Sequence, residues 1–206
     1  MVIKSSNFCI VLSSPSGAGK TTISKSLLKK DKSLKLSISC TTRPIRKGEI
    51  HKKDYIFAST KQFNQLIKKN KFLEYANVFG HMYGTLNETI NEFFKKKKDV
   101  LFDIDWQGFQ QLKQSNKEVV GIFILPPSKK ELIKRLKIRA RDTADEMEKR
   151  MGMVQNEVSH FLEYDYVVIN KDLNSCVKKI KNIIDSERLK RSRLINLTNF
   201  VNKFRN

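Results

Sequence analysis

The stretch IVLSSPSGAGKTT, residues 10–22, decides the fold because it joins an apolar run to a helical pattern through a loop of small residues. Residues 10–12 are apolar without interruption, which is typical of a strand buried on both faces of a sheet. From Thr21 onward the apolar residues recur at helical spacing. The stretch therefore predicts a strand, a tight loop and a helix in immediate succession.

The loop SPSGAGKTT, residues 14–22, is typical of a phosphate-binding loop between a strand and a helix. Its glycines let consecutive backbone N–H groups surround phosphate oxygens, and the positive end of the helix that begins near Lys20 points at the same place. We expect Lys20 to reach the β and γ phosphates of a nucleotide and the Thr21 hydroxyl to bind Mg²⁺. Ser14 stands where glycine is usual, and a negative φ at Ser14 would be enough for the motif to be retained. The predicted phosphate-loop contacts are Ser14, Pro15, Ser16, Gly17, Ala18, Gly19, Lys20, Thr21 and Thr22.

A second motif, VLFDID at residues 100–105, is an apolar strand that ends in acids. Asp103 and Asp105 are two positions apart, so they point to the same side of an extended strand. Two carboxylates at the carboxyl edge of a parallel sheet are costly to bury without a partner. We therefore expect a cation or ligand beside them, with Asp103 near the Mg²⁺ of a phosphate-loop enzyme.

Near-continuous apolar runs recur along the chain and alternate with helical patterns. Such runs are typical of strands that helices cover on both faces, so we predict an α/β fold with a central parallel sheet flanked by helices. The predicted strands are 8–13, 35–39, 99–104, 118–125 and 165–169.

Three helix starts are predicted from a Ser or Thr followed three positions later by Glu, the spacing of a capping box. Further helical patterns cover residues 60–70 and the tail from Ser175. The three predicted boxes are Thr85 with Glu88, Ser128 with Glu131, and Thr143 with Glu146.

Two segments interrupt the alternation of strands and helices. Residues 40–85 contain short strand patterns and turns, and residues 126–164 start at a Pro-Pro pair and hold an arginine-rich helical pair. We predict a single domain over residues 1–206 into which both segments are inserted as lobes. The predicted core comprises 1–39, 86–125 and 165–206.

The first inserted segment carries residues suited to a second phosphate. Arg43 and Arg46 lie in the motif SISCTTRPIRKGE, and Tyr55 and Tyr83 follow. Two fixed arginines and two tyrosines form a cradle that binds phosphate through paired hydrogen bonds. Glu74 in the same segment would not favour phosphate, but it suits a base that offers two adjacent donors.

The formal net charge of +20 is the most conspicuous bulk property. Nucleic-acid binding therefore stays an alternative function, although lysines spread along the whole chain also follow from compositional bias.

The three cysteines and three histidines are scattered, which argues against a disulfide framework and a metal cluster. No apolar segment is long enough for a membrane span or a secretory leader, so we expect a cytoplasmic protein without a membrane partner.

Across nearly its full length, the sequence resembles the bacterial guanylate kinases. The matching blocks are PSGAGKTT, SISCTTRPIRKGE, KDY, FLEYANVFGHMYGT, LFDID, RLKIRARDT and VVINKDL, in the order and at the spacing of that family. The resemblance implies a P-loop nucleoside monophosphate kinase fold, in which residues 40–85 form a GMP-binding lobe and residues 126–164 form a helical lid. It also implies Mg²⁺-dependent transfer of the ATP γ-phosphoryl group to GMP or dGMP, giving ADP and GDP.

The resemblance further implies a role for each matching residue. Thr21 and Asp103 match positions near the metal, and Asn170 matches a residue near the adenine of ATP. The implied catalytic cations are Lys20, Arg43 and the lid arginines Arg135, Arg139 and Arg150. The implied GMP contacts are Ser39, Arg43, Arg46, Glu49, Tyr55, Glu74, Tyr83, Thr85 and Asp105.

Two other functions stay open at this point. A guanylate-kinase-like module that binds phosphopeptides without catalysis would have a degraded phosphate loop, whereas residues 19–21 and Asp103 fit the catalytic pattern. A basic nucleic-acid-binding protein would bind DNA or RNA with a steep dependence on salt.

The sequence does not determine the oligomeric state, and a homodimer is compatible with it. Lys52 stands where a small residue is common, which leaves the shape of that turn open.

Overall fold

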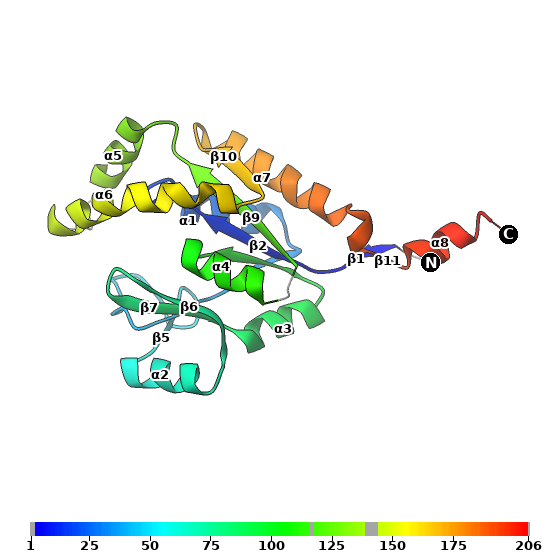
Figure 1. Ribbon diagram of the computed structural model, residues 1–206, viewed down its shortest axis with the longest axis horizontal. Helices are drawn as coiled ribbons and strands as arrows, with labels where there is room; N and C mark the ends of the chain where they lie inside the picture. The colour runs from blue at the N-terminus through cyan, green and yellow to red at the C-terminus, as the bar shows by residue number, and fades with distance from the viewer. Residues whose placement is uncertain (1–2, 116–117, 139–143, 206) are drawn as a thin grey trace.

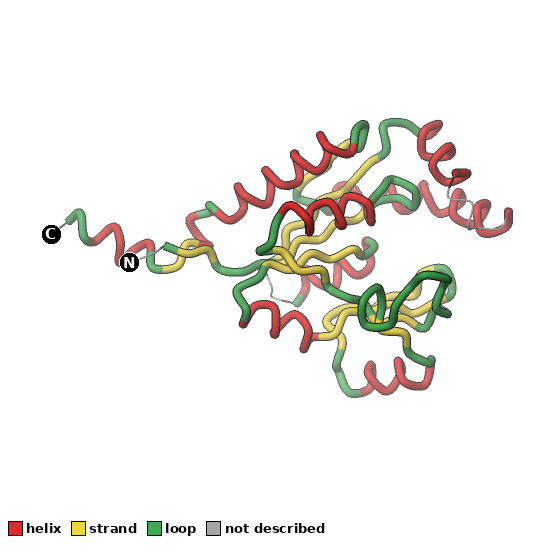
Figure 2. The backbone as a smooth tube through the Cα atoms, turned by 180° about the vertical axis from the view of Figure 1, so that it is seen from behind, coloured by secondary structure: helices red, strands yellow, loops and turns green. Residues whose placement is uncertain are grey.

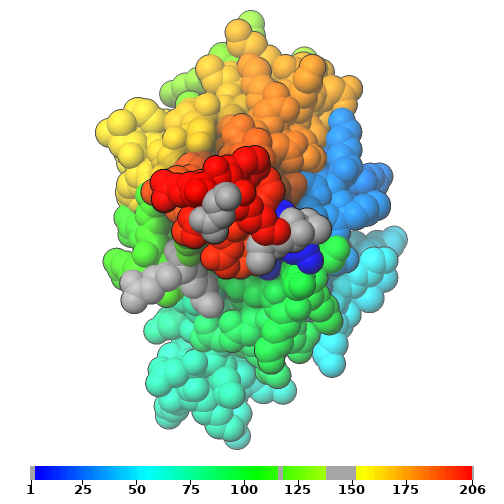
Figure 3. All heavy atoms as spheres, turned by 90° about the vertical axis from the view of Figure 1, so that its right-hand side faces the viewer, coloured from blue at the N-terminus to red at the C-terminus, as the bar shows by residue number. Residues whose placement is uncertain are grey.

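The chain folds around one central sheet, with helices on both faces and two parts that project from the same end (Figure 1). The computed structural model describes residues 3–115, 118–138 and 144–205. The first and last described segments lie beside each other at the opposite end of the molecule (Figures 1 and 3). The two projecting parts are therefore remote from the chain ends.

The central sheet consists of five strands, and each overlaps one of the predicted apolar runs. They are β2 (Cys9–Ser13), β3 (Leu34–Leu36), β8 (Asp99–Asp103), β9 (Val119–Leu125) and β10 (Tyr166–Ile169). Their order is β10-β9-β2-β8-β3, and every neighbouring pair is parallel, which confirms the predicted sheet. Open parallel sheets bind ligands outside the carboxyl ends of their strands.

Side chains of β2 alternate between two buried apolar clusters, one on each face of the sheet. The first cluster packs against helices α1 (Lys20–Lys30) and α7 (Leu173–Arg188). The second packs against α3 (Asn87–Lys95) and α4 (Trp106–Gln114). Helices thus cover both faces (Figure 2), which explains why the strands are apolar throughout instead of alternating with polar residues.

Strand β3 ends earlier than the predicted run of 35–39. At Ser37 the backbone N–H still donates to Leu101 O (2.8 Å), but the Ser37 hydroxyl already reaches the hydroxyl of Thr85 (3.4 Å). The chain leaves the sheet at this point and enters the first projecting part. The strand was therefore predicted correctly and its boundaries incorrectly.

The first projecting part is built on a second sheet, which we call the lobe sheet. Its strands are β4 (Cys40–Thr41), β5 (Ile56–Phe57), β6 (Phe72–Val78) and β7 (His81–Leu86). Their order is β5-β4-β7-β6, so β6 is an edge strand that pairs antiparallel with β7. The register shifts between Phe72 and Glu74, which makes Leu73 the extra residue of a β-bulge.

The predicted capping boxes had different outcomes. Ser128 accepts a hydrogen bond from Glu131 N (3.2 Å), as predicted. The box at Thr85 is wrong, because Thr85 belongs to strand β7 and α3 starts after Leu86 without a side-chain cap. Thr143 lies outside the described residues. A box of Ser59 with Gln62 begins helix α2 (Thr60–Lys68) and was not predicted.

The second projecting part is helical. Helices α5 (Lys129–Ile138) and α6 (Ala144–Ser159) are followed by a short 3₁₀ helix, η1 (His160–Glu163). Trp106 of α4 stacks on His160 with ring centroids 3.6 Å apart and planes 9° from parallel. This stacking joins the base of the helical part to the core.

The chain ends in a small structure beyond α7. Strand β1 (Lys4–Ser5) pairs antiparallel with β11 (Leu194–Ile195), and α8 (Leu197–Asn202) follows. The predicted helical tail is thus confirmed as far as the end of α7 and is interrupted afterwards. Within the described ranges, no helix combines the length and apolar character needed to cross a membrane.

Candidate active site

The phosphate loop has the backbone that its glycines predict. Gly17 and Gly19 have φ of 90° and 99°, in the left-handed region that glycine adopts without strain, and Gly19 is the N-cap of α1. Ser14 is not among the described residues with positive φ. The serine that departs from the usual pattern therefore fits the loop.

Lys20 and Asp103 meet beside this loop. The parallel register of β2 and β8 pairs Leu12 with Asp103, which places the acid next to the start of the loop. Lys20 Nζ lies 2.9 Å from Asp103 Oδ1 and donates to Ile104 O (3.0 Å). The sheet thus brings together two predicted residues that are 83 positions apart in the printed sequence.

Asn170 holds the phosphate loop from the far side. Its side chain is 6% exposed and donates from Nδ2 to Ala18 O (2.8 Å). A Cβ on Gly19 would lie 2.7 Å from the same Nδ2, so glycine is required for this approach as well as for its φ. Arg135 Nη2 donates to Asn170 O (3.3 Å), while its Nε donates to Glu131 (2.9 Å). Helix α5 is therefore tied to the loop through Asn170.

If ATP and GMP are the substrates that the resemblance implies, we expect Asn170→Ala to raise KM for ATP by about tenfold, because it removes one buried hydrogen bond that shapes the loop. KM for GMP should stay at the wild-type value, since the lobe does not contact this amide. Asn174→Ala, at an exposed position in the first turn of α7, is the matched control and should change neither constant. Steady-state kinetics with each substrate varied in turn checks both variants, and an unchanged KM for ATP in Asn170→Ala would contradict the assignment.

A carboxylate of α6 occupies an anion-binding position on the loop. The backbone N–H of Ser16 donates to Glu157 Oε2 (3.1 Å). N–H groups of this loop are the donors that bind phosphate oxygens in phosphate-loop proteins. Glu157 was not predicted, because a single glutamate in a helical segment carries no local signal. ATP must displace this carboxylate if it binds the same N–H.

The lobe arginines are organised around Glu49. Arg43 is 8% exposed and donates to Glu49 Oε1 (2.7 Å) and Pro44 O (2.6 Å). The backbone N–H of Arg46 donates to Glu49 Oε2 (2.8 Å), and the Arg46 side chain is exposed. Burial opposes ionisation of Glu49, but these hydrogen bonds outweigh it and hold the pKa of Glu49 below its ordinary value. Glu49 therefore fixes Arg43 in place.

Two tyrosines complete this side of the lobe. The rings of Tyr55 and Tyr83 meet edge to face with centroids 6.0 Å apart, and the Arg43 guanidinium lies 5.3 Å from the Tyr55 ring centroid. Burial and the charge of Asp103 raise the pKa of Tyr55 to about 12. Tyr55 thus lies within electrostatic range of the acid beside the phosphate loop. Lys52 closes the preceding turn with φ of 64°, which settles the shape of that turn.

Glu74 is the buried acid of the lobe. It is 3% exposed, and its Oε1 has no hydrogen-bond partner among the described residues. Burial raises the pKa of Glu74 to about 7; hydrogen bonds to Thr85 act against this shift, and the charge of Asp105 adds to it. Thr85 is fully buried, and its hydroxyl oxygen also accepts a hydrogen bond from the hydroxyl of Ser37. Ser37 was not predicted, although it lies two positions before the predicted Ser39.

Asp105 and Ser39 have structural contacts in addition to their predicted roles. Asp105 is the N-cap of α4, and its Oδ1 accepts from Gly108 N (3.1 Å) while its Oδ2 accepts from Gln107 (3.0 Å). The backbone O of Ser39 accepts from Ile56 N (2.9 Å). Asp105 also acts on Glu74 through its charge, and the role of Ser39 stays a prediction.

Two predicted lid residues cannot be placed. Arg139 lies outside the described residues, and the side chain of Arg150 is likewise outside them. Their roles stay predictions.

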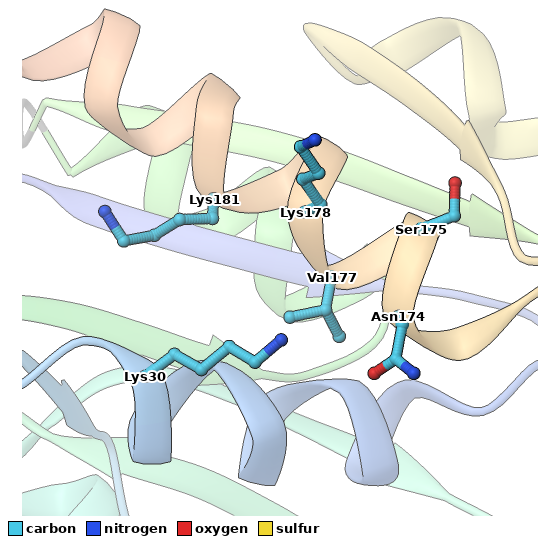
Figure 4. A pocket seen from close by; sticks show the side chains of 6 residues that line it. All are labelled: Lys30, Asn174, Ser175, Val177, Lys178 and Lys181. Carbon is cyan, nitrogen blue, oxygen red and sulfur yellow. The ribbon is translucent and has the colours of Figure 1, made fainter.

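A hollow of about 440 Å³ lies between α1 and α7 (Figure 4). None of the predicted site residues lines it, so it is separate from the phosphate loop. Lys181 on its rim is paired with Asp185 and Asp31 and is not a free cation. The hollow is lined by Lys30, Asn174, Ser175, Val177, Lys178 and Lys181.

The arrangement of phosphate loop, lobe and helical part agrees with comparisons to known proteins. The family model described as Guanylate kinase matches residues 6–187. The chain belongs to the guanylate kinase family. A guanylate kinase of Rickettsia prowazekii is 50% identical over 190 residues, which cover 92% of this chain and 96% of the relative. A guanylate kinase of Paramagnetospirillum magneticum is 46% identical over 197 residues, covering 95% and 92%.

A solved guanylate kinase shares the fold. The crystal structure of guanylate kinase from Anaplasma phagocytophilum has a TM-score of 0.81 and 35% identity, and the match covers 97% of this chain and 96% of that one. The chain is thus a nucleoside monophosphate kinase that phosphorylates GMP with ATP. The comparisons do not favour the non-catalytic alternative.

Proposed function

We propose that guanylate kinase chemistry in this chain uses ATP on the phosphate loop and GMP on the lobe, and that Glu74 selects the guanine base. The observation that carries the proposal is the buried Glu74 carboxyl, whose Oε1 lacks a partner in the described part of the chain. A buried acceptor without a donor is costly. Guanine offers two adjacent donors, N1–H and its exocyclic amine, and adenine lacks this pair.

On the ATP side, the loop N–H groups and the start of α1 bind the phosphates. Lys20 forms an ion pair with Asp103 in this structure, and it reaches the β and γ phosphates when ATP is present. Asn170 keeps the loop in shape and lies near the adenine. The residues proposed to contact ATP are Ser14, Pro15, Ser16, Gly17, Ala18, Gly19, Lys20, Thr21, Thr22 and Asn170.

The donor set beside the loop fits Mg²⁺. Thr21 and Asp103 offer oxygen atoms, the ligand type that Mg²⁺ prefers, and kinase sites use one or two protein oxygens together with substrate phosphates. No group of three or more His, Cys, Asp or Glu residues that could hold a metal by itself occurs in the described ranges. Bound Mg²⁺ would neutralise charge on the β and γ phosphates of ATP.

On the GMP side, the lobe binds the phosphate and the base at separate places. Arg43, Arg46, Tyr55 and Tyr83 supply donors for the phosphate, and Arg43 is already fixed by Glu49. Glu74 and Thr85 line the base site, with Ser39 as the proposed donor to guanine O6. The residues proposed to contact GMP are Ser39, Arg43, Arg46, Glu49, Tyr55, Glu74, Tyr83, Thr85 and Asp105.

The chemistry consists mainly of charge neutralisation and positioning. Two unit charges 4 Å apart repel by about 4 kcal/mol at an effective dielectric constant of 20, so bringing GMP phosphate to ATP requires several cations. Lys20 and Arg43 supply two of them. No general base is needed, because the accepting phosphate is already anionic.

The helical part supplies the remaining cations in this proposal. Arg135, Arg139 and Arg150 are assigned to the phosphates as charge spreads over the transferring group, where one arginine is worth roughly 10³ to 10⁵ in rate. Closure of residues 126–164 as a lid would exclude water and prevent hydrolysis of ATP. Residues 40–85 act as the GMP-binding lobe on the remaining core of a single domain.

The substrates also indicate where the enzyme works. ATP and GMP are cytoplasmic nucleotides, so we propose a cytoplasmic location, and nothing in the site calls for a membrane or nucleic acid. The formal charge of +20 is accounted for by lysines distributed along the chain.

Phosphorylation of four nucleotides tests the proposal. A coupled assay of ADP formation from ATP, with GMP, AMP, CMP or UMP as the acceptor, should show activity with GMP that exceeds the activity with AMP by roughly 10⁴-fold. Omission of Mg²⁺ with added chelator should abolish the signal. Equal rates with GMP and AMP would overturn the role of Glu74.

The pKa of Glu74 predicts a pH dependence of GMP binding. With a pKa of about 7 in the free enzyme, Glu74 is largely protonated at pH 6 and ionised at pH 8. Only the ionised carboxylate accepts from both guanine donors, so kcat/KM for GMP should rise by about tenfold between pH 6 and pH 8. KM for ATP should change little over the same range.

Ionisation of the GMP phosphate, with a pKa of about 6, contributes at the acid end of this profile. The Glu74→Gln variant retains that contribution and lacks the carboxyl, so the difference between the two profiles isolates Glu74. Parallel profiles for wild type and variant would contradict the assignment.

A further inference from the structure

We propose that helix α4 positions the Glu74 carboxylate through Gly108 and Gln111, and that these two residues set the selectivity for a purine that carries a 2-amino group. The proposal rests on the role of Glu74 in binding guanine and adds to it. Neither residue needs to touch the nucleotide. Both act through Glu74, so we describe them as positioning residues.

Gly108 lies where α4 packs against the acid. A Cβ at Gly108 would lie 2.6 Å from Glu74 Oε2 and 3.2 Å from its Cδ. Real Cβ atoms do not approach so closely, so any side chain at position 108 must displace the carboxylate or the helix. The carboxylate therefore rests against the bare Cα of this glycine.

The backbone conformation of Gly108 gives no other reason for a glycine. It lies inside the helix and is not among the described glycines with positive φ. Glycine is the poorest helix former after proline, so an ordinary helix would gain from alanine here. The closest atom to a Cβ at position 108 is Glu74 Oε2, with Ile104 Cδ1 next at 3.1 Å, so the approach of Glu74 is the main feature that requires the missing side chain.

Gln111 fixes the strand that carries Glu74. Its Oε1 accepts from Tyr75 N (3.0 Å), and its Nε2 donates to Tyr75 O (2.8 Å). Because β6 is an edge of the lobe sheet, these Tyr75 groups form no strand ladder on that side. The Gln111 amide thus makes the two backbone hydrogen bonds that a neighbouring strand would otherwise make to Tyr75, the residue next to Glu74.

The bulge in β6 completes the arrangement. Leu73 is the extra residue, and the following Glu74 pairs with Thr85 and points into the buried side. A bulge re-aims a side chain but does not fix how deep it lies. Gly108 sets the depth of the carboxylate, and Gln111 sets the position of its backbone.

The position of the carboxylate decides which base it recognises. GMP offers N1–H and the 2-amino group, whereas IMP offers N1–H alone. A carboxylate displaced from Gly108 loses the geometry for two parallel hydrogen bonds and keeps at most one. The ratio of kcat/KM for GMP to that for IMP therefore reports its position directly.

The first test is Gly108→Ala. We expect KM for GMP to rise by at least about tenfold and the GMP-to-IMP ratio to fall by about tenfold, the effect of one lost hydrogen bond to a charged group. The kcat at saturating GMP and KM for ATP should stay within about twofold of wild type, because a Cβ at position 108 would first meet Glu74 and Ile104, and neither belongs to the phosphate loop. The control is Gln114→Ala, at an exposed position at the end of the same helix.

The second test separates Gln111 from its neighbour. Gln111→Leu should raise KM for GMP and lower the GMP-to-IMP ratio, since it leaves the Tyr75 backbone unpaired. Gln110→Leu, at an exposed position that loses only the contact with Glu163 (3.0 Å), should leave both values unchanged. Thermal melting of all variants accompanies the kinetics.

A compensating change makes the test independent of folding. Glu74→Asp shortens the acid and relieves its contact with a Cβ at position 108. The rise in KM for GMP that Glu74→Asp causes should therefore be smaller in the Gly108→Ala background than in the wild type. Wild-type kinetics and GMP-to-IMP ratio in Gly108→Ala would overturn the proposal. A loss shared equally by kcat and both KM values, with strictly additive effects of the two substitutions, would also overturn it. Failure of the wild-type protein to phosphorylate GMP would instead refute the proposed function.

Discussion

Lys20→Ala should lower kcat by about 10³-fold or more while KM for GMP stays within about twofold of the wild-type value. In the structure, Lys20 Nζ forms an ion pair with Asp103 (2.9 Å) and donates a hydrogen bond to Ile104 O (3.0 Å) beside the phosphate loop. Its charge acts on the transferring phosphoryl group, where loss of one unit charge at 4 Å costs about 4 kcal/mol at an effective dielectric constant of 20. That energy corresponds to about three powers of ten in rate.

The measurement is steady-state ADP formation with GMP and ATP varied separately. Lys25→Ala is the matched control, because Lys25 is an exposed lysine on the same helix. Calorimetric titration of GMP into the Lys20→Ala variant should give the wild-type affinity, since Lys20 pairs with Asp103 and Ile104 O and not with a residue of the lobe. A fully active Lys20→Ala enzyme would refute the phosphate-loop assignment.

Glu74→Gln should raise KM for GMP by about 10²-fold or more and leave KM for ATP unchanged. The substitution keeps the shape of the side chain but removes the charge and places an amide donor against the donors of guanine. Hydrogen bonds to charged groups contribute about 1.5–3 kcal/mol each, so the loss of a pair accounts for this effect. Glu92→Gln, at an exposed position on α3, is the control.

A stability measurement separates this binding effect from a folding defect. The folded-state pKa of Glu74, about 7, lies above its ordinary value of 4.5, so the folded protein retains a proton that the unfolded chain releases. The contribution of Glu74 to stability is therefore present below pH 4.5 and is lost as the pH rises through about 7. The Gln variant does not titrate, so at pH 8 its melting temperature should equal or exceed that of the wild type. A lower melting temperature at pH 8 would indicate a structural role.

Local patterns predicted the parts of the chain whose structure depends on their own residues. The five apolar runs became the five parallel strands, and the glycines at 17 and 19 adopt the left-handed φ of the phosphate loop. Predictions of boundaries were weaker. Strand β3 ends where the chain turns toward Thr85, and Thr85 itself is a strand residue and not a helix cap.

Some residues of the candidate site were predicted and others were missed, because only some of them belong to local motifs. Lys20, Asp103 and Glu74 were identified from motifs, and the structure places Lys20 with Asp103 and buries Glu74. Glu157 on the loop amide and Ser37 beside Thr85 were missed. Neither belongs to a pattern of residue type and spacing, because each acquires its role from a partner far along the chain.

The sequence alone determined the order of the elements, the phosphate loop and the family of chemistry, because hydrophobic periodicity and glycine placement act over a few neighbouring residues. Tertiary structure alone decided how the guanine-facing acid is held. Gly108 and Gln111 contact Glu74 and Tyr75 only because α4 packs against the edge strand of the lobe. Contacts of this kind join residues more than 30 positions apart, and no local pattern encodes them.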